Sequence, residues 1–128
     1  MTDIRKMLEL AAKACGYEID RENQHFRDES KYGHVGLYIK RVSTCWAPHV
    51  DDGDNSRMRT KLRIDVLWVY AENGDAVGVE CSVMRHHGDR FFTMRARWIE
   101  MLADHNNDPD AALRLCALRV AAQMGEQM

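Results

Sequence analysis

A pair of apolar runs joined by a tight-turn signal constrains this fold more than any other feature of the chain. Residues 64–70 are rich in branched and aromatic side chains, and residues 76–84 alternate apolar with smaller or polar ones. Between them, Asn73-Gly74-Asp75 offers the residue types of a tight turn, since Gly adopts positive φ at no steric cost. The pattern predicts a β-hairpin. One face of its second strand is formed by Val77, Val79, Cys81 and Val83.

The segment 90–98 fits two structures, and a turn over residues 86–89 precedes it. Strict alternation favours a third strand of an antiparallel meander. A helix over residues 89–102 is the alternative, because part of the segment also has helical spacing. We predict the strand. Its two faces would carry Phe92, Met94, Ala96 and Trp98 on one side and Phe91, Thr93, Arg95 and Arg97 on the other.

Helices are predicted at both ends of the chain. Residues 2–15 form an amphipathic stripe, with Thr2 as N-cap and Gly16 at the position that favours a left-handed residue. The C-terminal helix begins with Asp108 as N-cap and Pro109 at the first helical position, and Gly125 is expected to end it. The N-terminal stripe contains Ile4, Met7, Leu8, Ala11 and Cys15. The inner stripe of the C-terminal helix contains Ala112, Leu115, Cys116, Arg119, Val120 and Gln123.

Between the first helix and the hairpin the signals are weaker. Residues 17–20 and 37–40 read as short strands, and the polar segment 21–31 reads as a loop. Gly33 and Gly36 indicate a bulge or a close backbone approach before the second strand.

The segment 45–62 (CWAPHVDDGDNSRMRTKL) combines an extended entry with a short helix. Pro48 favours an extended conformation for the preceding residue. Asp52 or Asp54 can cap a helix over about residues 54–62, which would serve as a connector between two parts of the sheet. Its apolar side is Met58 and Leu62, and its exposed basic side is Arg57, Arg59, Lys61 and Arg63.

Consecutive strands without crossover helices predict an α+β fold. We expect an antiparallel meander sheet packed with N- and C-terminal helices and a short connecting helix, in an α-β-α sandwich-like arrangement. The 128 residues are sufficient for a single domain, 1–128, with one continuous core.

Composition excludes several classes of partner. The net charge is −2, so charge alone provides no attraction to duplex nucleic acid. No apolar run reaches membrane-spanning length, and the N-terminus lacks the apolar segment of a secretory signal. The four cysteines are far apart and lack zinc spacing, which is typical of buried thiols in a reducing compartment. These features predict a cytoplasmic protein.

Two segments resemble a known family. The segment 46–54 (WAPHVDDGD) is similar to the Trp-Asn-Pro-x-x-Asp-Asp-Gly-Asp segment of small phage and prophage proteins of the phage ABA-sandwich type, with Ala47 in place of the Asn. The segment 107–112 (NDPDAA) and the helix that follows it are similar to the C-terminal helix of that family. The resemblance implies a phage accessory protein, expressed in an infected bacterial host, and an α+β sandwich.

Arginines and aromatic rings provide the candidate binding residues. Arginines make bidentate contacts with anions, and aromatic rings stack on bases. A solvated sheet edge with core aromatics is the more common arrangement of such residues. The candidate ligand-binding residues are Trp46, His49, Arg85, Arg90, Arg95 and Arg97.

No pattern of catalytic or metal-binding residues stands out. The acidic cluster Asp51, Asp52 and Asp54 does not follow the spacing of an EF-hand loop, and helix capping explains it better. The histidines at 86 and 87 lack further zinc ligands. No nucleophile, P-loop or dinucleotide motif is found. We therefore expect neither enzymatic activity nor a cofactor or metal.

The sequence leads to a binding function. Our first hypothesis is a phage counter-defence protein that sequesters a small anionic signalling nucleotide at the interface of a homo-oligomer. The alternatives are an anti-CRISPR-like inhibitor that binds a host defence complex, a single-stranded nucleic-acid binder and a weak metal-dependent hydrolase that uses the acidic cluster.

Overall fold

The computed structural model describes residues 3–20, 26–27, 35–86 and 92–128. It confirms the α+β class and the helices at both ends. The described helices and strands are α1 (Ile4–Ala14), β1 (Phe26–Arg27), β2 (Gly36–Ile39), β3 (Ser43–Trp46), α3 (Asp52–Leu62), β4 (Asp65–Tyr70), β5 (Ala76–His86), β6 (Phe92–Met101), the 3-10 helix η1 (Leu102–His105) and α4 (Pro109–Glu126). None of the described helices is long and apolar enough to cross a membrane.

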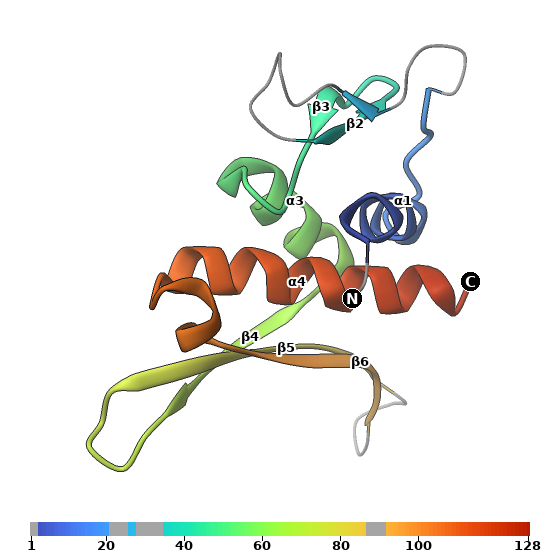
Figure 1. Cartoon of the computed structure of the whole chain (residues 1–128). Coiled ribbons are helices and arrows are strands. Elements are labelled where there is room, and N and C mark those ends of the chain that lie inside the picture. The colour runs from blue at the N-terminus through green and yellow to red at the C-terminus, as the bar shows by residue number, and fades with distance from the viewer. Residues whose placement is uncertain (1–2, 21–25, 28–34, 87–91) are drawn as a thin grey trace.

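The strands form two separate antiparallel sheets, β1-β2-β3 and β4-β5-β6. Figure 1 shows the small sheet at the top, α1 and α3 beneath it, α4 across the middle and the large sheet below α4. The helices therefore lie between the two sheets. The sequence predicted that α3 connects two parts of one sheet, whereas α3 leads from one sheet to another on the far side of α4.

The large sheet is the predicted meander. β4 and β5 form the hairpin around Gly74, whose φ is 90°. β6 pairs with β5 along its length, so the strand prediction for this segment is confirmed over residues 92–98 and the helical alternative is wrong there. Residues 90 and 91 lie outside the described residues. A bulge between Val83 and Met84 shifts the register near the distal end of the sheet.

The N-terminal helix ends as its sequence predicted, but it begins differently. Its N-cap is Asp3, whose carboxylate accepts a hydrogen bond from the Arg5 N–H at 3.0 Å, and not Thr2. At the other end Gly16 has a φ of 74°, and the N–H groups of Gly16 and Tyr17 donate to the carbonyls of Lys13 and Ala12. This pair of bonds is a Schellman motif, which satisfies two carbonyls of the last turn.

The C-terminal helix is the centre of the molecule. Asp108 caps it and Pro109 begins it, as predicted, but Gly125 does not end it, because the helix continues to Glu126. Residues on several sides of α4 are buried, since the large sheet covers one side and α1 and α3 cover another. The single inner stripe of the prediction therefore underestimates how much of this helix is core. The buried residues are Ala112, Cys116, Ala117, Leu118, Val120, Ala121, Ala122, Met124 and Gly125.

The small sheet differs most from the sequence prediction. Phe26–Arg27 is a strand inside the predicted loop, and Ser43–Trp46 is a strand that the sequence analysis missed. The predicted strand at 17–20 is reduced to a bridge between Ile19 and Ile39. These strands are very short, so whether they form depends on pairing with neighbouring strands and not on the local sequence pattern.

Gly36 confirms the predicted close backbone approach, because a Cβ there would overlap Cys45 Sγ on β3. Gly33 lies outside the described residues.

The connecting helix α3 begins two residues earlier than predicted. Its N-cap is Asp51, whose carboxylate accepts the Asp54 N–H at 2.8 Å, and not Asp52 or Asp54. Met58 and Leu62 are buried, as predicted. The helix ends at Arg63, which takes a left-handed conformation.

Candidate functional site

The aromatic candidate, Trp46, is part of the core. Its side chain is only 1% exposed, and its ring packs edge-to-face on Tyr17 with 5.6 Å between centroids. A base could stack on this ring only if the core opened. His49 lies in the turn between β3 and α3, where its carbonyl accepts a hydrogen bond from Arg114 Nε at 3.3 Å.

The described arginine candidates lie on two adjacent strands. β5 carries Arg85 and β6 carries Arg95 and Arg97, and the register places Arg85 opposite Thr93, two residues from Arg95. Arg97 forms an ion pair with Glu80. Arg85 and Arg95 are exposed, and neither has a carboxylate partner within the described part of the chain. Arg90 lies outside the described residues.

The structure does not bring the five described candidates together. Trp46 belongs to the small sheet and the described arginines belong to the large sheet, and α4 runs between the two sheets (Figure 1). A pocket that combines the Trp46 ring with Arg97 therefore does not exist in this fold.

The acidic cluster at the start of α3 is built into the fold. Asp51 caps the helix, and buried Asp54 accepts the Ala47 N–H at 3.0 Å and pairs with Arg57 at 2.7 Å. Asp52 pairs with Arg114 of α4 at 2.8 Å. These contacts account for each carboxylate structurally. No group of metal-ligating side chains suited to an ion was found among the described residues.

A buried polar cluster around Glu100 was missed by the sequence analysis. Glu100 is opposite Val79 on the face of the large sheet that α4 covers, and it is 9% exposed. Its Oε2 accepts a hydrogen bond from Trp98 Nε1 at 2.8 Å, and its Oε1 lies 2.9 Å from His105 Nε2. Arg119 Nε lies 3.3 Å from Oε2 and forms an ion pair.

The signal for this cluster was present in the alternation of the strand. Ala96, Trp98 and Glu100 occupy one face of β6, so a carboxylate follows two core-facing positions. A charge at such a position needs buried partners, because an unpaired buried charge is costly. The identity of those partners depends on η1 and α4, which pack against the strand only in the folded chain.

A pocket of about 240 Å³ borders this cluster. The Arg119 guanidinium lies 5.0 Å from the centroid of the Trp98 ring, a cation–π distance. Both oxygens of Glu100 already have partners, so the carboxylate fixes the tryptophan and the arginine in place. The pocket is lined by Met7, Trp98, Arg119, Ala122, Gln123 and Glu126.

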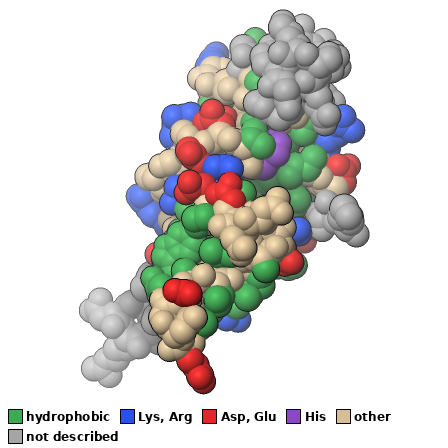
Figure 2. Space-filling model, turned by 60° about the vertical axis from the view of Figure 1, so that its left-hand side comes forward, with side chains coloured by type: hydrophobic (Ala, Val, Ile, Leu, Met, Phe, Trp, Pro, Cys, Tyr) green, Lys and Arg blue, Asp and Glu red, His purple; other side chains and the backbone are tan. Residues whose placement is uncertain are grey.

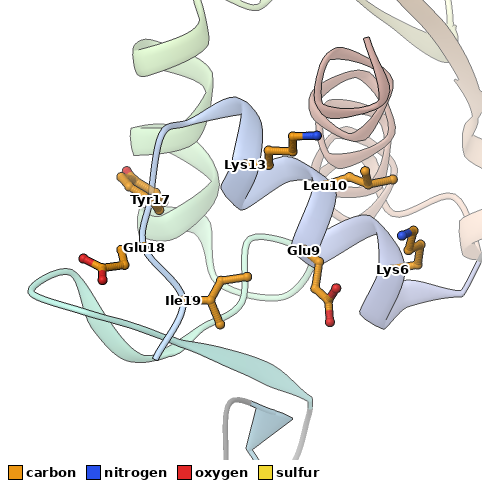
Figure 3. Close-up of a pocket in the computed structure, with 7 residues that line it drawn as sticks. All are labelled: Lys6, Glu9, Leu10, Lys13, Tyr17, Glu18 and Ile19. Atoms are coloured by element: carbon orange, nitrogen blue, oxygen red, sulfur yellow. The ribbon is translucent and has the colours of Figure 1, made fainter. Parts of the chain in front are cut away.

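A larger pocket of about 400 Å³ lies along α1 (Figure 3). Two lysines and two glutamates line it, so their formal charges cancel. In Figure 3 the charged side chains point in different directions and do not converge on one point. Lys13 Nζ also donates to the Met128 carbonyl at 3.0 Å. The lining residues are Lys6, Glu9, Leu10, Lys13, Tyr17, Glu18 and Ile19.

No protein-family model, no curated protein and no solved structure matches this chain.

Proposed function

We propose that this protein binds a small anionic ligand without chemically changing it, and that Arg85 and Arg95 make the main contacts. The observation that carries the proposal is that both guanidinium groups are exposed on neighbouring strands, and neither has a described carboxylate partner. Two arginines at this spacing suit an anion with several oxygens, such as a phosphate group.

The aromatic part of the proposal moves from Trp46 to Trp98. Trp98 is 39% exposed and lies three residues after Arg95 on β6. A ring and arginines on neighbouring strands are the combination that binds nucleotides through stacking and phosphate contacts. Arg97 contributes less in this proposal, because its Nε is already paired with Glu80.

The biological setting is part of the same proposal. The resemblance of residues 46–54 to phage ABA-sandwich proteins supports a phage accessory protein that sequesters a signalling nucleotide of host defence. The cysteines described are all free thiols, and Cys15, Cys81 and Cys116 are buried. Free thiols are typical of a reducing compartment, which supports the cytoplasm of the infected cell.

Calorimetry tests the ligand proposal directly. The wild-type protein is titrated with cyclic and ADP-ribose-derived nucleotides. For any nucleotide that binds, the Arg85→Ala/Arg95→Ala double variant should bind at least about 100-fold more weakly, because each charge-assisted contact contributes roughly 1.5–3 kcal/mol. Arg63→Ala is the control, since Arg63 is an exposed arginine at the end of α3. Failure of every nucleotide to bind, or equal losses in the control, would contradict the proposal.

A second candidate function is inhibition of a host defence complex by direct protein contact. The observation that favours it is an exposed apolar face of the large sheet, which carries Leu67, Ile99 and Met101. A nucleotide binder should recover no stoichiometric host protein in a pull-down, whereas an inhibitor of this kind should.

A further inference from the structure

The large sheet has one face that no described element covers. The inner face packs on α4 through buried Val79, Cys81 and Val83. Side chains alternate along a strand, so the residues between these point the other way, and residues directly opposite on neighbouring strands share a face. We call the opposite side the outer face. It consists of Asp65, Leu67, Val69, Gly78, Glu80, Ser82, Met84, Met94, Arg97, Ile99 and Met101.

The outer face is strongly apolar for an exposed surface. Leu67 is 64% exposed, and Met94, Ile99 and Met101 are each more than 40% exposed. Figure 2 shows hydrophobic side chains gathered on the lower half of the molecule, at the level of the large sheet. Contiguous apolar patches on soluble domains mark interaction sites.

Side chains of α4 already occupy part of the edge formed by β6. Gln123 of α4 donates to the Arg97 carbonyl and accepts from the Arg97 N–H, each at 3.1 Å. Gln127 donates to the Arg95 carbonyl at 2.6 Å. These side chains satisfy backbone groups that an added strand would need. The β6 edge is therefore covered at Arg95 and Arg97, and the outer face is the larger open surface of the sheet.

The pattern of the outer face is complementary to itself. The register sets out three rows across the strands, and in each row the β4 residue and the β6 residue form a suitable pair. The first row has an acid on β4 and a base on β6, and the other two rows are apolar at both ends. The rows are Asp65-Ser82-Arg97, Leu67-Glu80-Ile99 and Val69-Gly78-Met101.

We propose that the outer face binds a second copy of this chain, face to face, about a two-fold axis parallel to β5. This rotation exchanges the two edges of the sheet, and each row then faces the same row of the second copy. β4 of one copy then lies over β6 of the other. Asp65 meets Arg97 of the second copy, and Leu67 meets Ile99 of the second copy. Each of these contacts occurs twice in the isologous dimer.

A two-fold axis perpendicular to the strands gives a poorer match. That rotation would reverse the order of the rows, so the row of Asp65 and Arg97 would face the row of Val69 and Met101. Charged side chains would then be buried against apolar ones, which is unfavourable. Charge complementarity therefore selects the parallel axis.

Glu80 lies near the proposed axis, where the two copies of this residue approach each other. Its side chain is only 17% exposed, and Arg97 of the same chain is paired with it. In the dimer each Arg97 lies between its own Glu80 and Asp65 of the second copy. The arrangement provides each buried carboxylate with a positive neighbour.

The size of the face sets the expected affinity. Three strands at about 4.8 Å spacing and about eight residues at 3.4 Å give a footprint on the order of 400 Å². Stable interfaces use about 800 Å² per partner, so this face is at the weak end. We expect a dimer with a Kd in the range of about 10–100 µM.

Sedimentation equilibrium over about 5–500 µM tests the proposal. The wild-type protein should change from monomer to dimer over this range. Leu67→Glu should weaken the dimer at least tenfold, whereas Val50→Glu should not. Val50 is a matched control, because it is 44% exposed and lies before α3. Circular dichroism confirms that each variant is folded. A wild-type monomer at all concentrations, or a dimer that persists in Leu67→Glu, would overturn the proposal.

A charge exchange tests the orientation. Asp65→Arg alone and Arg97→Asp alone should each dimerise more weakly, because each places two like-charged pairs at the interface. Mixed together, the two variants should form a heterodimer. One variant then has a positive side chain at both positions 65 and 97, and the other has a negative side chain at both, so both contacts between position 65 and position 97 join opposite charges. Failure of the mixture to associate, with both variants folded, contradicts the parallel axis.

The dimer and the proposed ligand site can fail separately. Arg85 and Arg95 are absent from the three rows, and Leu67 is absent from the ligand site. A wild-type chain that stays monomeric would show that the second-copy proposal is wrong. If a host defence protein then protects the side chains of the outer face from a covalent surface label, that protein occupies the face instead.

Discussion

At the scale of single residues, burial decides the role of chemically similar groups. Trp46 and Trp98 have the same side chain, yet Trp46 is 1% exposed and Trp98 is 39% exposed. Gly125 shows the same principle for the smallest residue. It looked like the end of the last helix, but a Cβ at this position would overlap the backbone of Leu10. The backbones of α4 and α1 therefore approach closely at Gly125, where no side chain fits between them.

Gly125→Ala should destabilise the protein by about 3 kcal/mol, because the added methyl group must push α1 away from α4. Gly53→Ala is the matched control, since Gly53 is also a helical glycine, and its new Cβ would meet the flexible end of Arg57 at 3.2 Å and Asp51 Oδ1 at 3.2 Å. The gain in helix propensity should keep the control within about 1 kcal/mol of wild type. Urea unfolding measures both free energies. Equal stability of the two variants would contradict this account of Gly125.

At the scale of elements, three neighbouring carboxylates at the start of α3 make three different structural contacts. Asp51 caps the helix, Asp52 reaches Arg114 on α4, and Asp54 fixes the end of β3 through the Ala47 N–H. Buried Asn55 adds a link, because its amide donates to the carbonyls of Pro48 and Arg114. The helix is thus attached to β3 and to α4, which explains why such a polar element is ordered.

Asp54→Ala should cost about 2–4 kcal/mol of unfolding free energy, because it leaves the fully buried Ala47 N–H without an acceptor and Arg57 without its ion-pair partner. Asp52→Ala should cost at most about 1 kcal/mol, since the Asp52 side chain is 77% exposed. Thermal and urea unfolding distinguish the two. A similar loss in both variants would mean that the cluster acts through its total charge.

At the scale of the whole molecule, the layering places the thiols in distinct environments. Cys81 of the large sheet and Cys116 of α4 are buried in the layer between them. The hydrogen bond with Cys116, together with burial, raises the pKa of the Cys81 thiol. Burial raises the pKa of Cys15 to about 12. Cys45, on the small sheet, is only half-buried.

Thiol labelling at pH 8 should therefore report global unfolding. The thiolate is the reactive form, so burial slows the reaction at Cys15, Cys81 and Cys116, and a raised pKa slows it further at Cys15 and Cys81. In the native protein only Cys45 should react within minutes with a disulfide reagent, and all four cysteines should react in denaturant. Cys45→Ser should abolish the rapid phase. Rapid reaction of Cys15 or Cys81 in the native state would show that the core opens locally.

The sequence by itself determined the elements that follow local rules. The hairpin around Gly74, the third meander strand, the Asp108-Pro109 helix start and the Schellman end at Gly16 all depend on residues within a few positions of one another. Turn chemistry, caps and alternation act at that range, so their signals can be read from the chain. The α+β class follows from the order of these elements.

Only the tertiary structure decided how those elements meet. The placement of α4 between the two sheets brings Arg119 to Glu100 and leaves one face of the large sheet uncovered by any described element. Packing of the small sheet, with Trp46 against Tyr17, buries Trp46. These outcomes depend on contacts between residues far apart in the chain, such as Asn55 with the carbonyl of Arg114. Burial is a property of the packed layers, and no local pattern encodes which arginine meets an acid and which stays exposed.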